Sequence, residues 1–224
     1  MRPIHKGVAP ASFATWTSSH SQVALPDWEA FSKRFPTIKS ALKAALVQEQ
    51  FGVCCYCERD LTGGAHIEHL MPKSLASALT YDYANLLASC EGEKGKGRAP
   101  ETCGHLKGTR ALPIHPLMPD CSAYFVFSSS GTVGPSPEAA RHAPALGSIS
   151  ILGRDSARIV ALRRVAIADI EAQLPPPGAT PEAKALLLAE VQRLLVAYSA
   201  PDANGRLAPF ATAVVQHLER YLTP

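Results

Sequence analysis

Six cysteines and a cluster of histidines near the middle of this 224-residue chain constrain its fold more than any other feature. Cys54 and Cys57 form a C-x-x-C pair, and Cys90 and Cys103 follow with twelve residues between them. The chain opens without an apolar signal-like segment, so we expect a cytoplasmic protein whose thiols stay reduced. In that compartment, two separated thiolate pairs predict a closed, tetrahedral Zn²⁺ site.

Other interpretations of the cysteines are open. Buried cysteines often serve as ordinary core residues, and we favour this for Cys55 and Cys121. A redox C-x-x-C is expected near a βαβ pattern, which the surrounding sequence lacks. A structural zinc site can contribute on the order of 10 kcal/mol, comparable with the whole stability of a small domain. Metal binding would therefore determine the fold of this region.

The run His66-Ile67-Glu68-His69 is the strongest indication of chemistry in the chain. Two histidines and a carboxylate this close together are costly to bury unless they are paired or bind a metal. Histidine suits the role of a base near neutral pH, and glutamate supplies an oxygen ligand for Mg²⁺ or Mn²⁺. In a strand, His66 and Glu68 lie on one face and His69 on the other, so the strand must end or bend at His69 for Glu68 and His69 to share one site. The amide of Asn85 can brace the loop that follows.

Competing motifs fit this run less well. The metalloprotease pattern H-E-x-x-H does not occur in it. A nucleobase deaminase places P-C-x-x-C after its H-x-E, whereas here the C-x-x-C comes first and no proline precedes it. A purely structural zinc module with spare histidines is the remaining alternative.

The order of the motifs resembles that of the HNH, or ββα-metal, endonucleases. More narrowly, it is similar to the PtuB-type proteins of Septu and retron-associated anti-phage systems. The matching runs are C-x-x-C, H-I-E-H-x-x-P-K-S, N-L-L-x-S-C and C-G-H-x-K, in chain order. The similarity extends to residues 1–7, 116–121 and 208–210, so it covers nearly the whole chain.

The resemblance implies a role for each matching residue. His69 would be the general base, Glu68 would help to hold a catalytic Mg²⁺ or Mn²⁺, and Asn85 would brace the loop that carries the base. His105 falls where the helix of such folds offers a further metal ligand, although Gly104 separates it from the last cysteine. The other matches are a second-tier catalytic candidate, His66, and the structural zinc ligands Cys54, Cys57, Cys90 and Cys103.

Charge gives only local support for a nucleic-acid partner. Lys+Arg 22 against Asp+Glu 19 leave a formal net charge of +3, so phosphate binding must depend on particular segments. The glycine-rich segment after Cys90 offers cations that we expect to contact nucleic acid, with DNA favoured over RNA. These residues are Lys94, Lys96, Arg98 and Lys107. The alternative is a charged loop that only faces solvent.

The chain lacks the phosphate-binding motif G-x-x-x-x-G-K-[ST], so we do not expect it to hydrolyse ATP. The resemblance implies an ATPase partner of the PtuA type instead. No stretch approaches the roughly 20 apolar residues of a membrane span, so we expect no membrane association.

We therefore predict an α+β protein with a zinc-stapled ββα-metal HNH core, a helical N-terminal segment and a C-terminal helical subdomain. Residues 1–53 would form an N-terminal arm and helix: prolines make 1–36 irregular, and apolar spacing predicts a helix over 37–51. The HNH core would span 54–110.

The remaining residues divide into two parts. Residues 111–148 would hold a β-hairpin, built from the aromatic run 123–127 and a short return strand, and then a connecting loop over 134–148. Three apolar stripes at helical spacing predict antiparallel helices over 149–224. The predicted activity is metal-dependent cleavage of nucleic acid in anti-phage defence. The alternative is a zinc module for nucleic-acid binding or assembly whose catalytic residues are vestigial.

Overall fold

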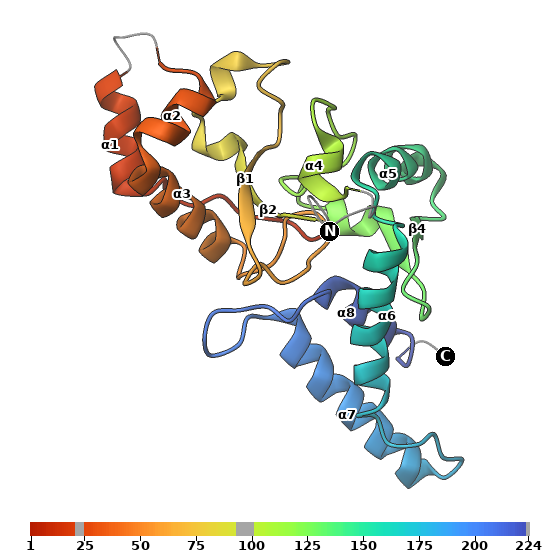
Figure 1. Ribbon diagram of the computed structural model, residues 1–224. Helices are drawn as coiled ribbons and strands as arrows, with labels where there is room; N and C mark the ends of the chain where they lie inside the picture. The colour runs from red at the N-terminus through yellow and green to blue at the C-terminus, as the bar shows by residue number, and fades with distance from the viewer. Residues whose placement is uncertain (21–24, 93–100, 223–224) are drawn as a thin grey trace.

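The computed structural model describes residues 1–20, 25–92 and 101–222, which form a mixed α and β fold. Figure 1 shows an elongated molecule with three helices at its N-terminal end, a short sheet near the middle and a group of helices at the opposite end. Among the described residues, no helix combines the length and the apolar composition needed to cross a membrane.

Helices already occupy the N-terminal arm, where the sequence predicted irregular structure. They are α1 (Ala11–His20), α2 (Trp28–Arg34) and α3 (Pro36–Glu49). The prediction of a helix over 37–51 is confirmed by α3, but an irregular 1–36 is wrong. The prolines flank the helices: Pro10 precedes α1, and Pro36 is the first residue of α3, where a missing N–H costs nothing. Aromatic packing stabilises the arm, with the Trp16 and Phe31 ring centroids 4.5 Å apart.

A two-stranded antiparallel sheet lies at the centre of the molecule. It pairs β1 (Ala65–His69) with β2 (Leu86–Cys90), so that His66 faces Ser89 and Glu68 faces Leu87. The loop between the strands contains the short 3-10 helices η1 (Ser77–Leu79) and η2 (Tyr83–Asn85). Helix α4 (Cys103–Lys107) follows and packs against β2, while α3 contacts both strands.

The buried side chain of Gln50 ties the end of α3 to this sheet. Its amide nitrogen donates to the carbonyl oxygens of Val53 (2.9 Å) and Ala88 (2.8 Å), and its amide oxygen accepts from the Ala88 N–H (2.7 Å). Because Val53 immediately precedes the first cysteine pair, these bonds fix the cysteine loop against β2.

The predicted hairpin is confirmed, but the connecting loop after it is wrong. Strands β3 (Phe125–Phe127) and β4 (Val133–Pro135) pair antiparallel after the 3-10 helix η3 (Cys121–Tyr124). Helix α5 (Ala139–Leu152) then fills most of the segment predicted as loop. Pro144 lies inside this helix. A stripe of buried residues at helical spacing outweighs the lost backbone bond: Ala145, Ser148, Ile149 and Leu152.

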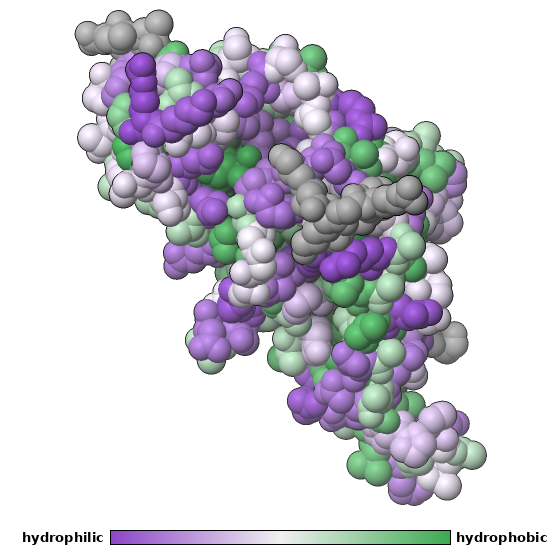
Figure 2. Space-filling model, viewed as in Figure 1, coloured by the Kyte–Doolittle hydropathy of each residue, from purple (hydrophilic) through white to green (hydrophobic). Residues whose placement is uncertain are grey.

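The three predicted C-terminal helices are confirmed. They are α6 (Ala157–Glu171), α7 (Pro181–Ser199) and α8 (Ala211–Glu219), and α8 contacts both of the others. Their inner faces are apolar, yet several apolar side chains point outward, including Val165, Leu186 and Val196. Figure 2 shows hydrophobic residues interspersed with hydrophilic ones over this part of the surface.

Candidate functional site

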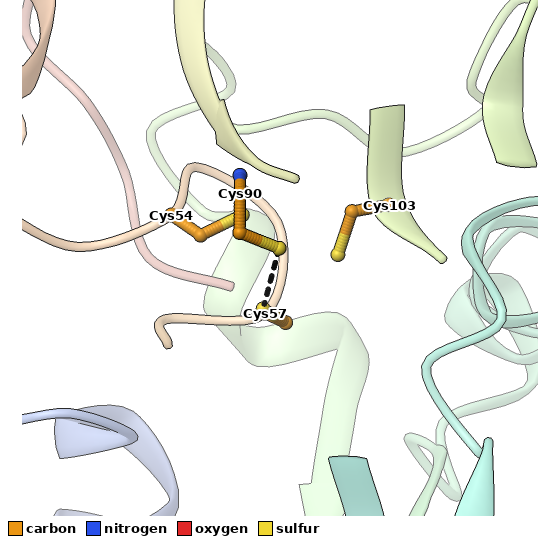
Figure 3. Close-up of side chains that lie close together, drawn as sticks. All are labelled: Cys54, Cys57, Cys90 and Cys103. Carbon is orange, nitrogen blue, oxygen red and sulfur yellow. Dashed lines mark hydrogen bonds between the residues drawn. The ribbon is translucent and has the colours of Figure 1, made fainter. Parts of the chain in front are cut away.

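Four buried cysteines converge beside the central sheet. Cys54 and Cys57 come from the loop after α3, Cys90 ends β2, and Cys103 begins α4. Their sulfur atoms all lie within 4.8 Å of one another, and Figure 3 shows them directed toward a common centre. The Sγ atoms of Cys57 and Cys90 are 3.8 Å apart. Tetrahedral zinc with Zn–S bonds of about 2.3 Å places neighbouring sulfurs roughly 3.8 Å apart, so this group has the dimensions of a zinc site.

The surroundings of the cysteines also suit a bound cation. The hydrogen bond with Cys54, those with Cys57 and Cys90, and burial raise the pKa of Cys103 well above its ordinary value. Four thiols this close cannot all ionise unless a positive charge joins them, and a divalent cation supplies that charge. The backbone N–H of Cys90 donates to the Cys54 sulfur at 3.3 Å, which further stabilises a thiolate there.

The backbone of Cys103 adopts a left-handed conformation with φ of 57°. For a residue with a Cβ this conformation costs roughly 1–2 kcal/mol, so the surrounding contacts must compensate for it. Convergence of the Cys103 thiol on the other three sulfurs is one such contact. Cys55 and Cys121 are buried outside the group of four, as expected for ordinary core thiols.

One face of β1 carries a buried carboxylate with three polar neighbours. Glu68 is 6% exposed, and its Oε1 accepts from Lys107 Nζ at 2.9 Å and from the Tyr56 hydroxyl at 3.1 Å. Its Oε2 faces the Nε2 of His66 at 3.4 Å. Burial by itself raises the pKa of Glu68, but the hydrogen bond with His66 and the charge of Lys107 outweigh burial, and the pKa falls below its usual value. Glu68 is therefore ionised at neutral pH.

A second group with the geometry of a metal site lies next to Glu68. His66, Glu91 and His105 each offer a ligand atom, and these atoms lie within 4.8 Å of one another. The Nε2 of His105 is 3.0 Å from Glu91 Oε2, and the His66 and His105 rings are 4.1 Å apart between centroids. The structure thus brings His105, a predicted ligand of the catalytic cation, together with His66, the second-tier catalytic candidate, whereas Glu68, the other predicted ligand, is not a member of this group. Glu68 touches this group through His66.

Gly104 makes this arrangement possible. A Cβ at Gly104 would lie 2.4 Å from Glu68 Oε2 and 2.5 Å from His66 Nε2, closer than real contacts of a Cβ. Gly104, which separates His105 from Cys103, therefore provides the space in which His66 and Glu68 meet.

His69, the last residue of β1, lies on the opposite face from His66 and Glu68. Its Nε2 is 3.0 Å from the carbonyl oxygen of Thr80. A carbonyl only accepts, so Nε2 carries the proton and Nδ1 keeps a free lone pair. Burial, and then the charge of Lys73, lowers the pKa of His69 to about 4. The ring is neutral at pH 7, which is the form a general base requires.

The side-chain amide of Asn85 holds the loop between β1 and β2. Its Oδ1 accepts from the Met71 N–H at 2.7 Å, and its Nδ2 donates to the carbonyls of Met71 (3.0 Å) and Leu79 (3.1 Å). Leu79 precedes Thr80, whose carbonyl orients His69. Asn85 therefore braces the loop that positions His69.

A surface depression of about 430 Å³ joins the two faces at the end of β1. Both Glu68 and His69 line it, together with Lys73, Ser74 and Gly108. Strand β1 does end at His69. The sequence required such an end, or a bend, for Glu68 and His69 to share one site.

Of the four residues predicted to contact nucleic acid, the structure describes only Lys107. Lys107 is 1% exposed and donates to Glu68 and to the carbonyl of His69 (3.1 Å), so it does not present its charge at the surface. This placement corrects the expectation of a phosphate contact at Lys107. The other three residues, Lys94, Lys96 and Arg98, lie outside the described residues.

Two residues of the site were absent from the sequence prediction. Tyr56 lies between the paired cysteines, and Glu91 directly follows Cys90. Both positions adjoin predicted zinc ligands, and this adjacency was the only signal that could have marked them. No protein-family model matches the chain, and no curated protein is significantly similar to it.

Proposed function

We propose that this chain is a metal-dependent HNH endonuclease that hydrolyses phosphodiester bonds of nucleic acid. One observation carries the proposal. Strands β1 and β2 with helix α4 carry a neutral, carbonyl-anchored His69 and an ionised Glu68, which line one depression, and the group His66, Glu91 and His105, which Glu68 contacts through His66. A neutral base at an exposed depression, joined through a carboxylate to a group of metal-ligating side chains, supplies the parts that phosphodiester hydrolysis needs.

Zn²⁺ and the catalytic cation would be held by different residues. The four cysteines would hold a structural Zn²⁺, because they offer four sulfur ligands and are all buried. His66, Glu91 and His105 would hold the catalytic cation. Two imidazoles with one carboxylate favour Mn²⁺ over Mg²⁺, since Mg²⁺ prefers oxygen ligands. When bound, this cation would stabilise the charge that develops on the phosphate.

His69 would accept the proton of the attacking water at Nδ1. The Thr80 carbonyl fixes the tautomer, and Asn85 fixes the segment that carries Thr80. Glu68 would orient His66, because its Oε2 faces the His66 ring while its Oε1 is anchored by Lys107 and Tyr56. The role of Glu68 is thus closer to positioning a ligand than to ligating the cation itself.

We further propose that the nuclease acts in anti-phage defence, on DNA rather than RNA, under the control of an ATPase of the PtuA type. The resemblance of the motif order to PtuB-type proteins supports this role. Apolar side chains exposed on α6 and α7 could contact such a partner: Val165, Leu186 and Val196.

A cleavage assay on supercoiled plasmid tests the proposed activity. The purified, zinc-loaded chain is incubated with Mn²⁺, with Mg²⁺ or without added cation, in the presence and absence of the ATPase. We expect nicked and linear DNA with Mn²⁺, and none with His105→Ala. His142→Ala serves as the matched control, since His142 is an exposed histidine on α5 outside the site. Binding of plasmid without cleavage under all of these conditions would favour the vestigial zinc module instead.

A further inference from the structure

A second depression adjoins the one that holds Glu68 and His69. It has a volume of about 550 Å³, within the roughly 300–1,000 Å³ typical of small-molecule sites. Trp28, Tyr81 and Ser77 are among the residues that line it, and Lys73 and Ser74 line both depressions. The two depressions therefore share the edge that Lys73 and Ser74 form.

The indole of Trp28 is fixed in place and stays partly exposed. Its centroid lies 5.2 Å from that of Phe31 and 5.6 Å from that of Tyr81, and it meets the ring of His69 nearly at a right angle, 4.5 Å away. Asp27 caps α2 at this point by accepting from the Ala30 N–H at 2.8 Å. Trp28 stays half-buried, whereas Trp16 in the same aromatic group is buried.

Lys73 places a cation beside both the Trp28 ring and the depression that Glu68 and His69 line. Lys73 is exposed, and its Nζ lies 5.7 Å from the centroid of the Trp28 ring. An ammonium group suits a phosphate oxygen, and an indole face suits a flat π-system. Lys73 and Trp28 both lie near His69. Lys73 matches the phosphate of a nucleotide, and Trp28 matches its base.

We propose that Trp28 and Lys73 form a subsite for a single unstacked nucleotide next to the scissile phosphate. The base stacks on Trp28, and Lys73 contacts the adjoining phosphate. This inference rests on the proposed nuclease function and deepens it. Bases in a continuous duplex are stacked on their neighbours and do not reach such a ring. The substrate class is therefore nucleic acid that is single-stranded or locally unpaired where it is cut.

The test compares two chains with the same phosphates. One is a short oligothymidylate, and the other is an abasic chain of equal length in which every base is absent. Binding to the zinc-loaded protein is measured without added Mn²⁺, so that cleavage plays no part. Stacking of a base on an aromatic side chain predicts that the wild-type protein prefers the oligothymidylate by at least about fivefold.

Variants separate the two halves of the subsite. Trp28→Ala should bind both chains equally, and Trp28→Phe should keep part of the preference because phenylalanine also stacks. Lys73→Ala should weaken both chains alike and leave the ratio unchanged. Leu188→Ala, at an exposed apolar position on the distant α7, is the control and should change neither. In the wild type, base stacking should also quench the fluorescence of Trp28, and Trp28→Phe should abolish that quenching.

The outcomes distinguish the inference from the proposed function. Equal binding of the two chains by the wild type, or an undiminished preference in a folded Trp28→Ala variant, would overturn the subsite. If the plasmid is cleaved in that case, the nuclease stands and the subsite alone is wrong. A preference that depends on Trp28, in a protein that never cleaves, would support the subsite and contradict the nuclease.

Discussion

Replacement of Asn85 by alanine tests the link between the braced loop and His69. Asn85 is 6% exposed and makes three hydrogen bonds to the loop backbone, at 2.7, 3.0 and 3.1 Å. A hydrogen bond contributes about 0.5–1.5 kcal/mol net, and a buried group that loses its partner costs more. Asn85→Ala should therefore lower the free energy of unfolding by roughly 2–4 kcal/mol.

Asn85→Asp separates the two halves of the amide. The carboxylate can still accept from the Met71 N–H, but it cannot donate to the carbonyls of Met71 and Leu79, and it places a negative charge against both. We expect a loss at least as large as that of Asn85→Ala. Thr80→Val is the matched control: it removes only the partly exposed hydroxyl bond to the Ser77 carbonyl and keeps the Thr80 carbonyl that holds His69. It should change stability by less than about 0.5 kcal/mol.

Urea unfolding of the zinc-loaded variants measures the stability change, and single-turnover cleavage under native conditions measures the effect on His69. Cleavage by Asn85→Ala should fall well below that of Thr80→Val at a temperature where both are folded. If Asn85→Ala unfolds within about 0.5 kcal/mol of the wild type, the amide does not hold the loop. Unchanged cleavage by a folded Asn85→Ala would contradict the role of the loop in placing His69.

Three further predictions follow from the site. Cys54→Ser should lose the zinc that metal analysis finds at about one ion per wild-type chain, and a soluble, active, zinc-free variant would show that the cysteines are ordinary thiols. Gly104→Ala should keep its zinc but weaken cleavage by on the order of 100-fold, because the new Cβ displaces His66 and Glu68. Cleavage at the wild-type rate would mean that these two side chains can shift without loss of function. Because burial lowers the pKa of His69 to about 4, an NMR titration of the His69 ring should have its midpoint near pH 4; a midpoint near 6.5 would mean that burial does not shift His69.

The sequence predicted those features that depend on spacing along the chain. The helix after Pro36, the hairpin around residues 128–132 and the C-terminal helices follow from apolar periodicity and turn residues. The grouping of Cys54, Cys57, Cys90 and Cys103 followed from ligand chemistry, because two separated thiol pairs match the four sulfur ligands of a structural zinc site.

Features that depend on tertiary packing were missed. Helix α2 has a readable start, since Asp27 caps it, but the surrounding prolines suggested an irregular arm. Helix α5 contains Pro144, which ordinarily argues against a helix, and only its burial against the rest of the fold compensates. The sequence did mark the end of α5, because Gly153 adopts the left-handed conformation that often follows a helix.

The site residues that were missed also depend on tertiary packing rather than on spacing along the chain. The five residues of α4 are too few for periodicity to reveal which face is buried, so Lys107 was expected at the surface although it pairs with Glu68. Glu91 and Tyr56 enter the site because the fold brings the cysteine loop, the end of β2 and the start of α4 together. No local sequence pattern predicts that these three segments come together.

Single-turnover cleavage by His69→Ala is the most direct test of the central claim. The variant and the wild type are compared with Mn²⁺ at equal zinc content, with His142→Ala as the control. We expect His69→Ala to lose on the order of 10²–10⁴ in rate while its zinc content and fold stay unchanged, because a general base contributes that much to hydrolysis. Cleavage at the wild-type rate by purified, zinc-loaded His69→Ala would contradict it.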